Sequence, residues 1–124
     1  MSNATVIHIQ HQPPSTNNLY ANVPGRGRVK SGRYKTWRSA AGWDVKAHKF
    51  ETFSCKVVLD LTVERPRVRS DVSNRIKAVE DLLVEMKVLA DDSLVEEVRC
   101  RWGNVKGCRI EIREFDMVTP LEAA

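Results

Sequence analysis

The sequence predicts one α+β domain over residues 1–124, with a small, mostly antiparallel four-stranded sheet and two helices in the order β-α-β-α-β-β. Three observations predict this fold class. The 124 residues fit a single domain. Apolar residues recur at strand or helix spacing in separate stretches along the chain. A glycine-bounded segment, 103–107, predicts a hairpin turn between the last two strands.

The first half of the chain predicts one strand, an open loop and one helix. Residues 5–10 form the strand, and Pro13-Pro14 ends it because paired prolines cannot continue a central strand. Residues 19–35 predict an open loop that contains several glycines. A helix is expected over residues 35–48, where apolar residues repeat at helical spacing. These residues are Trp37, Ala40, Ala41, Val45 and His48.

The second half predicts a helix between strands. Apolar and polar residues alternate in the expected strands, and this alternation is typical of half-buried strands. The helix opens at Asp71 or Ser73, because either side chain can cap its first turn. Residues 89–92 form a tight link after the helix. The expected strands are 57–64, 94–102 and 108–112. The apolar stripe of the helix consists of Ile76, Val79, Leu82, Leu83 and Met86.

Positive charge is concentrated in residues 1–79. They hold 14 lysines and arginines against five acids, whereas residues 80–124 hold six against 11, and the net charge of the chain is only +4. An unevenly charged, solvated surface would explain this balance alone. However, residues 24–38 concentrate six cations and two aromatic residues without an acid, which favours a nucleic-acid partner. The six cations expected to bind DNA are Arg26, Arg28, Lys30, Arg33, Lys35 and Arg38.

Several classes of protein are excluded by composition. No apolar run approaches the roughly 20 residues that a membrane span needs. The N-terminus lacks the basic start and apolar stretch of a signal peptide. Cys55, Cys100 and Cys108 form neither an even disulfide framework nor a zinc motif with the histidines. We therefore expect a cytoplasmic protein with reduced, buried thiols, no membrane partner and no small-molecule cofactor.

Two acidic elements stand where metal chemistry is possible. Asp71 lies among five basic residues between a strand and a helix, and Asp91-Asp92 follows that helix. Because the helix is roughly 20 Å long, its ends meet only if the following segment folds back along it or a dimer partner supplies one acid. Carboxylates suit Mg²⁺, which activates water and neutralises charge on a scissile phosphate. Lys77 would stabilise the transition state, and Arg67, Arg69 and Arg75 would hold the DNA backbone.

Each of these residues also has an ordinary structural interpretation. Asp71 alone is typical of a helix cap, Asp91-Asp92 of a turn, and Lys77 of a solvated helix surface. Only the basic segment favours a functional interpretation by itself. A different function, a small RNA-binding module, remains open if Tyr34 and Trp37 stack on bases.

Taken together, the motifs resemble the RusA family of crossover-junction endonucleases over nearly the whole chain. The segment Pro13-Pro14-Ser15-Thr16-Asn17-Asn18-Leu19-Tyr20 is similar to the N-terminal Pro-Pro-Ser-x-Asn element of that family. The most specific likeness is an Asp-x-Asp-Asn-x-x-Lys pattern followed by a helix and an Asp pair. In this chain the pattern consists of Asp71, Ser73, Asn74, Lys77 and Asp91-Asp92.

The resemblance implies a function and a site. Family members form homodimers, need Mg²⁺ or Mn²⁺, and resolve four-way (Holliday) DNA junctions by paired symmetric nicks in recombination and repair; many are encoded by prophages. A two-fold dimer suits this substrate, because the two cuts are themselves related by a two-fold axis. By resemblance, Asp71, Asp92 and Lys77 are the catalytic residues, and Asp71, Asp91 and Asp92 are the metal ligands.

Ser73 departs from the family pattern, which has an aspartate at that position. Serine is neutral and a weak ligand, so the site loses one negative charge. Asp91, the amide oxygen of Asn74, or a water held by Ser73 can compensate, and we expect an active enzyme with a rearranged metal shell. The alternative is a branched-DNA-binding protein with weak or no cleavage, because Ser73 replaces that aspartate.

Overall fold

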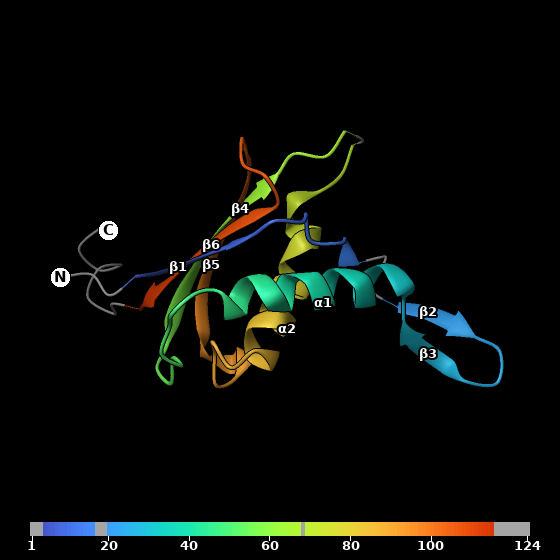
Figure 1. Cartoon of the computed structure of the whole chain (residues 1–124), viewed down its shortest axis with the longest axis horizontal. Coiled ribbons are helices and arrows are strands. Elements are labelled where there is room, and N and C mark those ends of the chain that lie inside the picture. The colour runs from blue at the N-terminus through green and yellow to red at the C-terminus, as the bar shows by residue number, and fades with distance from the viewer. Residues whose placement is uncertain (1–3, 17–19, 68, 116–124) are drawn as a thin grey trace.

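A computed structural model describes residues 4–16, 20–67 and 69–115 of the chain. One four-stranded sheet carries two helices, α1 (Gly32–Lys46) and α2 (Ile76–Glu85), on the same face (Figure 1). The strand order is β1-β6-β4-β5. The strands are β1 (Thr5–Ile9), β4 (Val57–Glu64), β5 (Val95–Gly103) and β6 (Cys108–Glu114). The α+β class and the predicted helices and sheet strands are thus confirmed.

The core lies between the helices and the inner face of the sheet. Val57, Leu59, Leu61 and Val63 point inward from β4 and are fully buried, as the strand periodicity predicts. The helices supply the other side of the core through residues at i, i+3 and i+4 spacing. Those from α1 include Tyr34, Trp37, Ala41 and Val45, and those from α2 are Ala78, Val79, Leu82 and Leu83.

The prediction of a hairpin between the last two strands is wrong. β5 and β6 are not neighbours, because β4 lies between them, parallel to β5 and antiparallel to β6. The sheet is therefore mixed. The physical reason is the burial of β4: its first three residues are buried on both faces, which favours the centre of the sheet. α2 then makes the crossover that a parallel pair requires.

The segment 104–107 connects β5 to β6 across the end of β4, because β4 lies between these two strands in the sheet. The backbone N–H of Glu64 donates to the carbonyl of Gly107 at 2.8 Å, and the Gly107 N–H donates to Glu64 Oε1 at 2.8 Å. Gly107 has φ +71°, and a Cβ there would lie 1.9 Å from the carbonyl oxygen of Ile9. Only glycine fits this close approach.

The loop expected over residues 19–35 contains a β-hairpin. β2 (Tyr20–Val23) and β3 (Gly27–Lys30) pair only with each other, and the hairpin projects away from the main body (Figure 1). α1 then begins at Gly32, before the expected Lys35, because the Ser31 hydroxyl accepts a hydrogen bond from the Tyr34 N–H at 3.1 Å. The sequence did not predict the hairpin because its strands contain no fully buried residues and so show no alternation of buried and exposed positions.

The cysteines are free, but only one is fully buried. Burial raises the pKa of the Cys108 thiol to about 12, and Cys100 is half-buried. Cys55 is exposed, so the expectation of buried thiols was wrong for this residue. No helix in the described part of the chain is long and apolar enough to cross a membrane.

Candidate active site

Asp71 lies at the start of a short 3-10 helix, η2 (Val72–Arg75), that leads directly into α2. Its side chain makes no capping hydrogen bond, although its backbone carbonyl accepts from the Asn74 N–H at 3.2 Å. Asp71 therefore occupies the N-cap position of η2, as the structural interpretation predicts, but its carboxylate does not cap the helix. Asp71 lines a polar pocket of about 330 Å³ with Ser15, Arg69, Ser70 and Asn74.

Lys77 lies on α2, one helical turn beyond Asn74. Its Nζ forms an ion pair with Asp81 at 3.1 Å, and half of its side chain stays exposed. The hydrogen bond and charge of Asp81 raise the pKa of Lys77, and the charge of Asp92 contributes in the same direction. Asp92 also acts on Glu80, whose pKa is raised mainly by burial. The structure thus brings Asp92 within electrostatic range of the Lys77–Glu80 turn.

The two aspartates of the Asp91-Asp92 pair have different environments. Asp91 caps a 3-10 helix, η3 (Asp92–Leu94), and its carboxylate accepts hydrogen bonds from the N–H of Ser93, at 3.0 Å, and from the Ser93 hydroxyl. These bonds lower the pKa of Asp91. Asp92 is exposed at the first position of η3, which packs beside α2. The structural interpretation therefore suits Asp91, whereas Asp92 is available for chemistry.

Asp92 acts electrostatically on Lys77, whereas neither residue lines the pocket of Asp71. η3, in the segment before β5, packs beside α2, as one of the two predicted routes to convergence requires. The convergence of Asp71 and Asp92 stays a prediction. Within residues 4–16, 20–67 and 69–115, no three His, Cys, Asp or Glu side chains cluster as a metal site. The donors beside Asp71 are nevertheless oxygens of carboxylate, hydroxyl and amide groups. Such donors fit a hard cation that keeps several waters and substrate oxygens as ligands.

Asn74 connects this site with the segment that follows β1. Its carbonyl accepts a hydrogen bond from the Thr16 hydroxyl at 2.9 Å, and its side chain lines the pocket of Asp71. Ser73 is exposed on η2. Asn17 and Asn18, which carry part of the family resemblance, lie outside the described residues.

The expected DNA-binding cations lie mostly on the surface. Arg26 and Arg28 are exposed on the β2–β3 hairpin, where the Arg28 guanidinium lies 4.5 Å from the centroid of the Tyr20 ring. Lys30 is 5.9 Å from the Tyr34 ring centroid. The other exposed members are Arg33, Lys35, Arg67 and Arg69. None of these seven forms an ion pair with an acid in the part of the chain that the structure describes.

Two of the expected DNA contacts have structural partners instead. Arg38 forms an ion pair with Glu85 of α2 at 2.7 Å. Arg75 is only 8% exposed, and its guanidinium donates to the carbonyl of Pro13 at 2.6 Å and to the Ser70 hydroxyl at 3.1 Å. Burial, with a smaller contribution from the charge of Arg33, lowers its pKa. We therefore remove Arg75 from the DNA-binding set.

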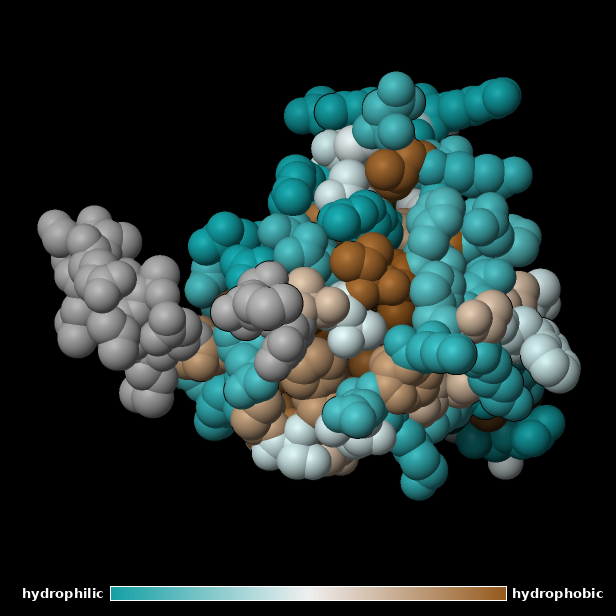
Figure 2. Space-filling model, turned by 60° about the vertical axis from the view of Figure 1, so that its left-hand side comes forward, coloured by the Kyte–Doolittle hydropathy of each residue, from teal (hydrophilic) through white to brown (hydrophobic). Residues whose placement is uncertain are grey.

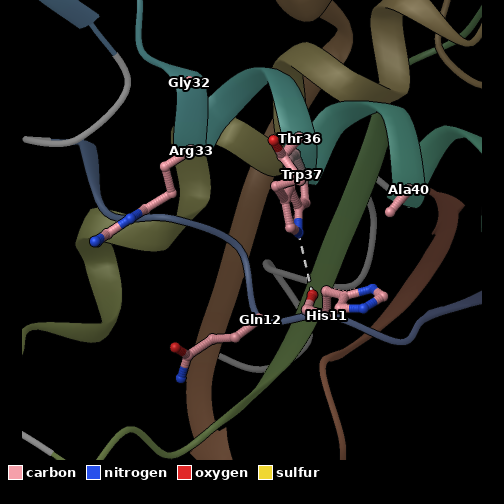
Figure 3. A pocket seen from close by; sticks show the side chains of 7 residues that line it. All are labelled: His11, Gln12, Gly32, Arg33, Thr36, Trp37 and Ala40. Atoms are coloured by element: carbon pink, nitrogen blue, oxygen red, sulfur yellow. Dashed lines mark hydrogen bonds between the residues drawn. The ribbon is translucent and has the colours of Figure 1, made fainter.

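The aromatic side chains proposed to stack on RNA bases are also buried. Tyr34 is 2% and Trp37 5% exposed, and Trp37 Nε1 donates to the carbonyl of His11 at 3.1 Å (Figure 3). This burial contradicts the RNA-binding hypothesis. Trp37 instead forms part of the wall of a mainly apolar pocket that contains no carboxylate. The other lining residues are His11, Gln12, Gly32, Arg33, Thr36 and Ala40.

Four residues near the site are not among the site residues predicted from the sequence. Asp81 was detectable, because an acid four residues after Lys77 lies on the same helical face. Glu80 follows Lys77 by three residues and was detectable in the same way. Arg65 and Trp102 line a second pocket beside the first, and this contact between distant segments has no signal in sequence spacing.

Comparison with known proteins gives one family. The model of the family described as Endodeoxyribonuclease RusA matches residues 11–113, which is most of the chain. A similar protein is Crossover junction endodeoxyribonuclease RusA of Aquifex aeolicus (strain VF5). It is 25% identical over 114 residues, which cover 88% of this chain and 90% of the relative. The match extends through the Asp71 pocket, α2 and η3. The chain therefore belongs to the RusA family of endodeoxyribonucleases.

Proposed function

We propose that this protein is a Mg²⁺-dependent endonuclease that resolves four-way DNA junctions by paired symmetric nicks. The observation that carries the proposal is the carboxylate of Asp71, which makes no capping hydrogen bond and lines a polar pocket with Arg69. A carboxylate that makes no capping hydrogen bond, next to a cation that has no acid partner among the described residues, suits a metal and a phosphate together. Family membership and the junction-cleaving relative support the same substrate.

Each side chain has a role that follows from its position. Asp71 and Asp92 would hold the cation, with the Asn74 amide as a further oxygen donor. When bound, the cation supplies an activated water and neutralises charge on the scissile phosphate. The partly exposed ammonium group of Lys77 would bind a phosphate oxygen of the substrate. Asp81 keeps that ammonium group charged and in place.

The proposal includes a homodimer. Two nicks related by a two-fold axis require two identical sites, and an isologous dimer provides them. The exposed hairpin cations would hold DNA arms outside the cutting site, because phosphate contacts fix the position of the substrate without reading its sequence. Analytical ultracentrifugation of the free protein and of its junction complex would test the two-protomer stoichiometry.

Cleavage of a synthetic four-way junction tests the chemical proposal. The wild-type protein should nick two opposing strands in the presence of Mg²⁺ or Mn²⁺. Asp92→Asn should lower the cleavage rate at least about 100-fold while junction binding is kept, since it removes a charge that acts on the transition state. Asp91→Asn is the matched control, because asparagine caps a helix as well as aspartate does. It should keep most activity.

The cleavage results distinguish a wrong assignment of Asp91 and Asp92 from a protein that does not cleave at all. Loss of cleavage in Asp91→Asn with full activity in Asp92→Asn would reverse the assignment of the two residues. Tight junction binding by the wild-type protein without nicking at any metal concentration would contradict the enzyme proposal.

The second candidate function is branched-DNA binding with weak or no cleavage. The absence of a three-acid cluster among the described residues favours it, because Ser73 supplies no carboxylate. Ser73→Asp should then lower the Mg²⁺ concentration needed for half-maximal cleavage. If the wild-type protein needs no more Mg²⁺ than this variant, the idea of a weakened metal shell is wrong.

A further inference from the structure

A second pocket adjoins the pocket of Asp71. It has a volume of about 290 Å³ and shares Arg69 and Ser70 with its neighbour. Its remaining walls come from the segment after β4 and from the end of β5, so it exists only in the folded chain. They are Arg65, Pro66, Arg67 and Trp102. Figure 2 shows mainly hydrophilic side chains at the upper end of the molecule, from which the segment after β4 projects in Figure 1.

The cations of this pocket have no acid partner in the part of the chain that the structure describes. Arg65, Arg67 and Arg69 are exposed, and none forms an ion pair within the described residues. Three guanidinium groups around one small space repel one another unless an anion joins them. A phosphodiester backbone supplies such charge, and guanidinium groups bind phosphate oxygens in a fork geometry.

Trp102 gives the pocket a planar, apolar wall. It is half-buried near the end of β5, and the buried Arg75 guanidinium lies over its ring, 5.7 Å from the centroid. The same guanidinium donates to the Ser70 hydroxyl. Arg75 therefore contacts two residues that line the pocket, from the buried side. An aromatic ring beside cations is the combination that binds unpaired nucleotides, with the ring against a base and the cations on phosphates.

We propose that this pocket, the Arg65–Trp102 pocket, binds the nucleotide next to the scissile phosphate. The inference rests on the proposed function, because that function places the scissile phosphate at Asp71. A strand that leaves the Asp71 pocket past Arg69 enters the Arg65–Trp102 pocket directly, since the two share that wall. Its phosphates contact the arginines and the flanking base contacts Trp102. Bases at a junction crossover can leave the helical stack at low cost, which suits this mode.

A binding experiment without metal tests the proposal independently of cleavage. Junctions carrying one abasic site at each position around the mapped cut are titrated with protein in EDTA. Removing the base that contacts Trp102 should weaken wild-type binding about ten-fold. Trp102→Leu should weaken binding to intact DNA by a similar factor and lose nothing more on the abasic junction. Trp102→Phe should keep most of the affinity.

Two further variants at exposed positions complete the test, one as a control for loss of a tryptophan and one as a probe of a phosphate contact. Trp43→Leu changes an exposed tryptophan on α1, 70% accessible, and should leave binding unchanged. Arg65→Gln changes an exposed cation and should reduce the slope of log affinity against log salt by about one. Thermal unfolding of every variant checks that the fold is intact.

The results distinguish this inference from the proposed function. If the losses from Trp102→Leu and from the abasic site simply add at every position, or if Arg65→Gln leaves the salt slope unchanged, the pocket does not bind the flanking nucleotide. The junction-cleavage proposal would stand in that case. Failure of the wild-type protein to bind either four-way or duplex DNA would overturn both.

Discussion

The open face of the sheet and the Arg65–Trp102 pocket both carry arginines, but only those on the sheet are neutralised. Arg101 contacts Asp60 at 2.7 Å, and Arg99 contacts Glu97 at 2.9 Å. Arg109 and Arg113 both contact Glu111, at 3.3 and 3.6 Å. In contrast, the three pocket arginines, Arg65, Arg67 and Arg69, form no ion pair with an acid among the described residues. Arginine content alone therefore does not identify the DNA surface.

The difference follows from local sequence. On a strand, residues two apart share a face, so Glu97 reaches Arg99 and Glu111 reaches its neighbours on β6. No acid occurs between Arg65 and Asp71. Exposed ion pairs of the first kind contribute little to stability, whereas uncompensated cations retain their full attraction for a polyanion.

The largest expected effect comes from removing the pocket cations together. Substituting Arg65, Arg67 and Arg69 by glutamine should weaken junction binding about 100-fold at low salt and reduce the salt slope by about three, because three phosphate contacts are lost. Fluorescence anisotropy at several salt concentrations measures both quantities.

A charge-matched control sharpens the comparison. Substituting Arg99, Arg109 and Arg113 by glutamine removes the same charge from the open sheet face, and affinity should stay within about three-fold. Equal losses in the two triple variants would mean that total charge, rather than position, governs binding.

Arg75 tests whether burial removes a cation from the DNA surface. Arg75→Gln should lower the free energy of unfolding by about 2 kcal/mol, because charged hydrogen bonds to Pro13 and Ser70 are lost. Junction affinity of the folded variant should change less than three-fold. Urea denaturation and anisotropy measure the two effects. A large loss of affinity without loss of stability would place Arg75 back among the DNA contacts.

The smallest expected effect concerns Lys77, a cation of the proposed site that is paired with an acid. The folded-state pKa of Lys77 is raised by Asp81, so the pair stabilises the fold below the unfolded lysine value of about 10.4, as long as the carboxylate is charged. This stabilisation is lost as the pH rises through the folded value. Asp81→Asn should therefore reduce stability at pH 7 by less than about 0.5 kcal/mol.

The same variant has a second readout. As the pH rises through the raised folded-state pKa of Lys77, the stabilities of wild type and Asp81→Asn should converge, as measured by urea denaturation across the alkaline range. A difference that persists or grows there would mean that Asp81 stabilises the fold by a route other than the charge of Lys77.

The sequence alone predicted the elements and the family well. Helix and strand positions follow from apolar periodicity, since a side chain must face the core or the solvent whatever the topology. The motif around Asp71 and Lys77 indicated the family before any geometry was known. Asp81 was within reach of the same reasoning, because helical spacing is fixed.

Only the tertiary structure decided which of those residues remain available for chemistry. It placed β4 between β5 and β6, because strand order depends on burial over the whole sheet. It assigned the Asp91 carboxylate to a helix cap, left the Asp71 carboxylate without a capping hydrogen bond and turned Arg75 inward. Trp102 and Arg65 met across 37 positions of sequence through the same folding. Sequence spacing determines local neighbours, whereas contacts between distant segments depend on how the whole core packs.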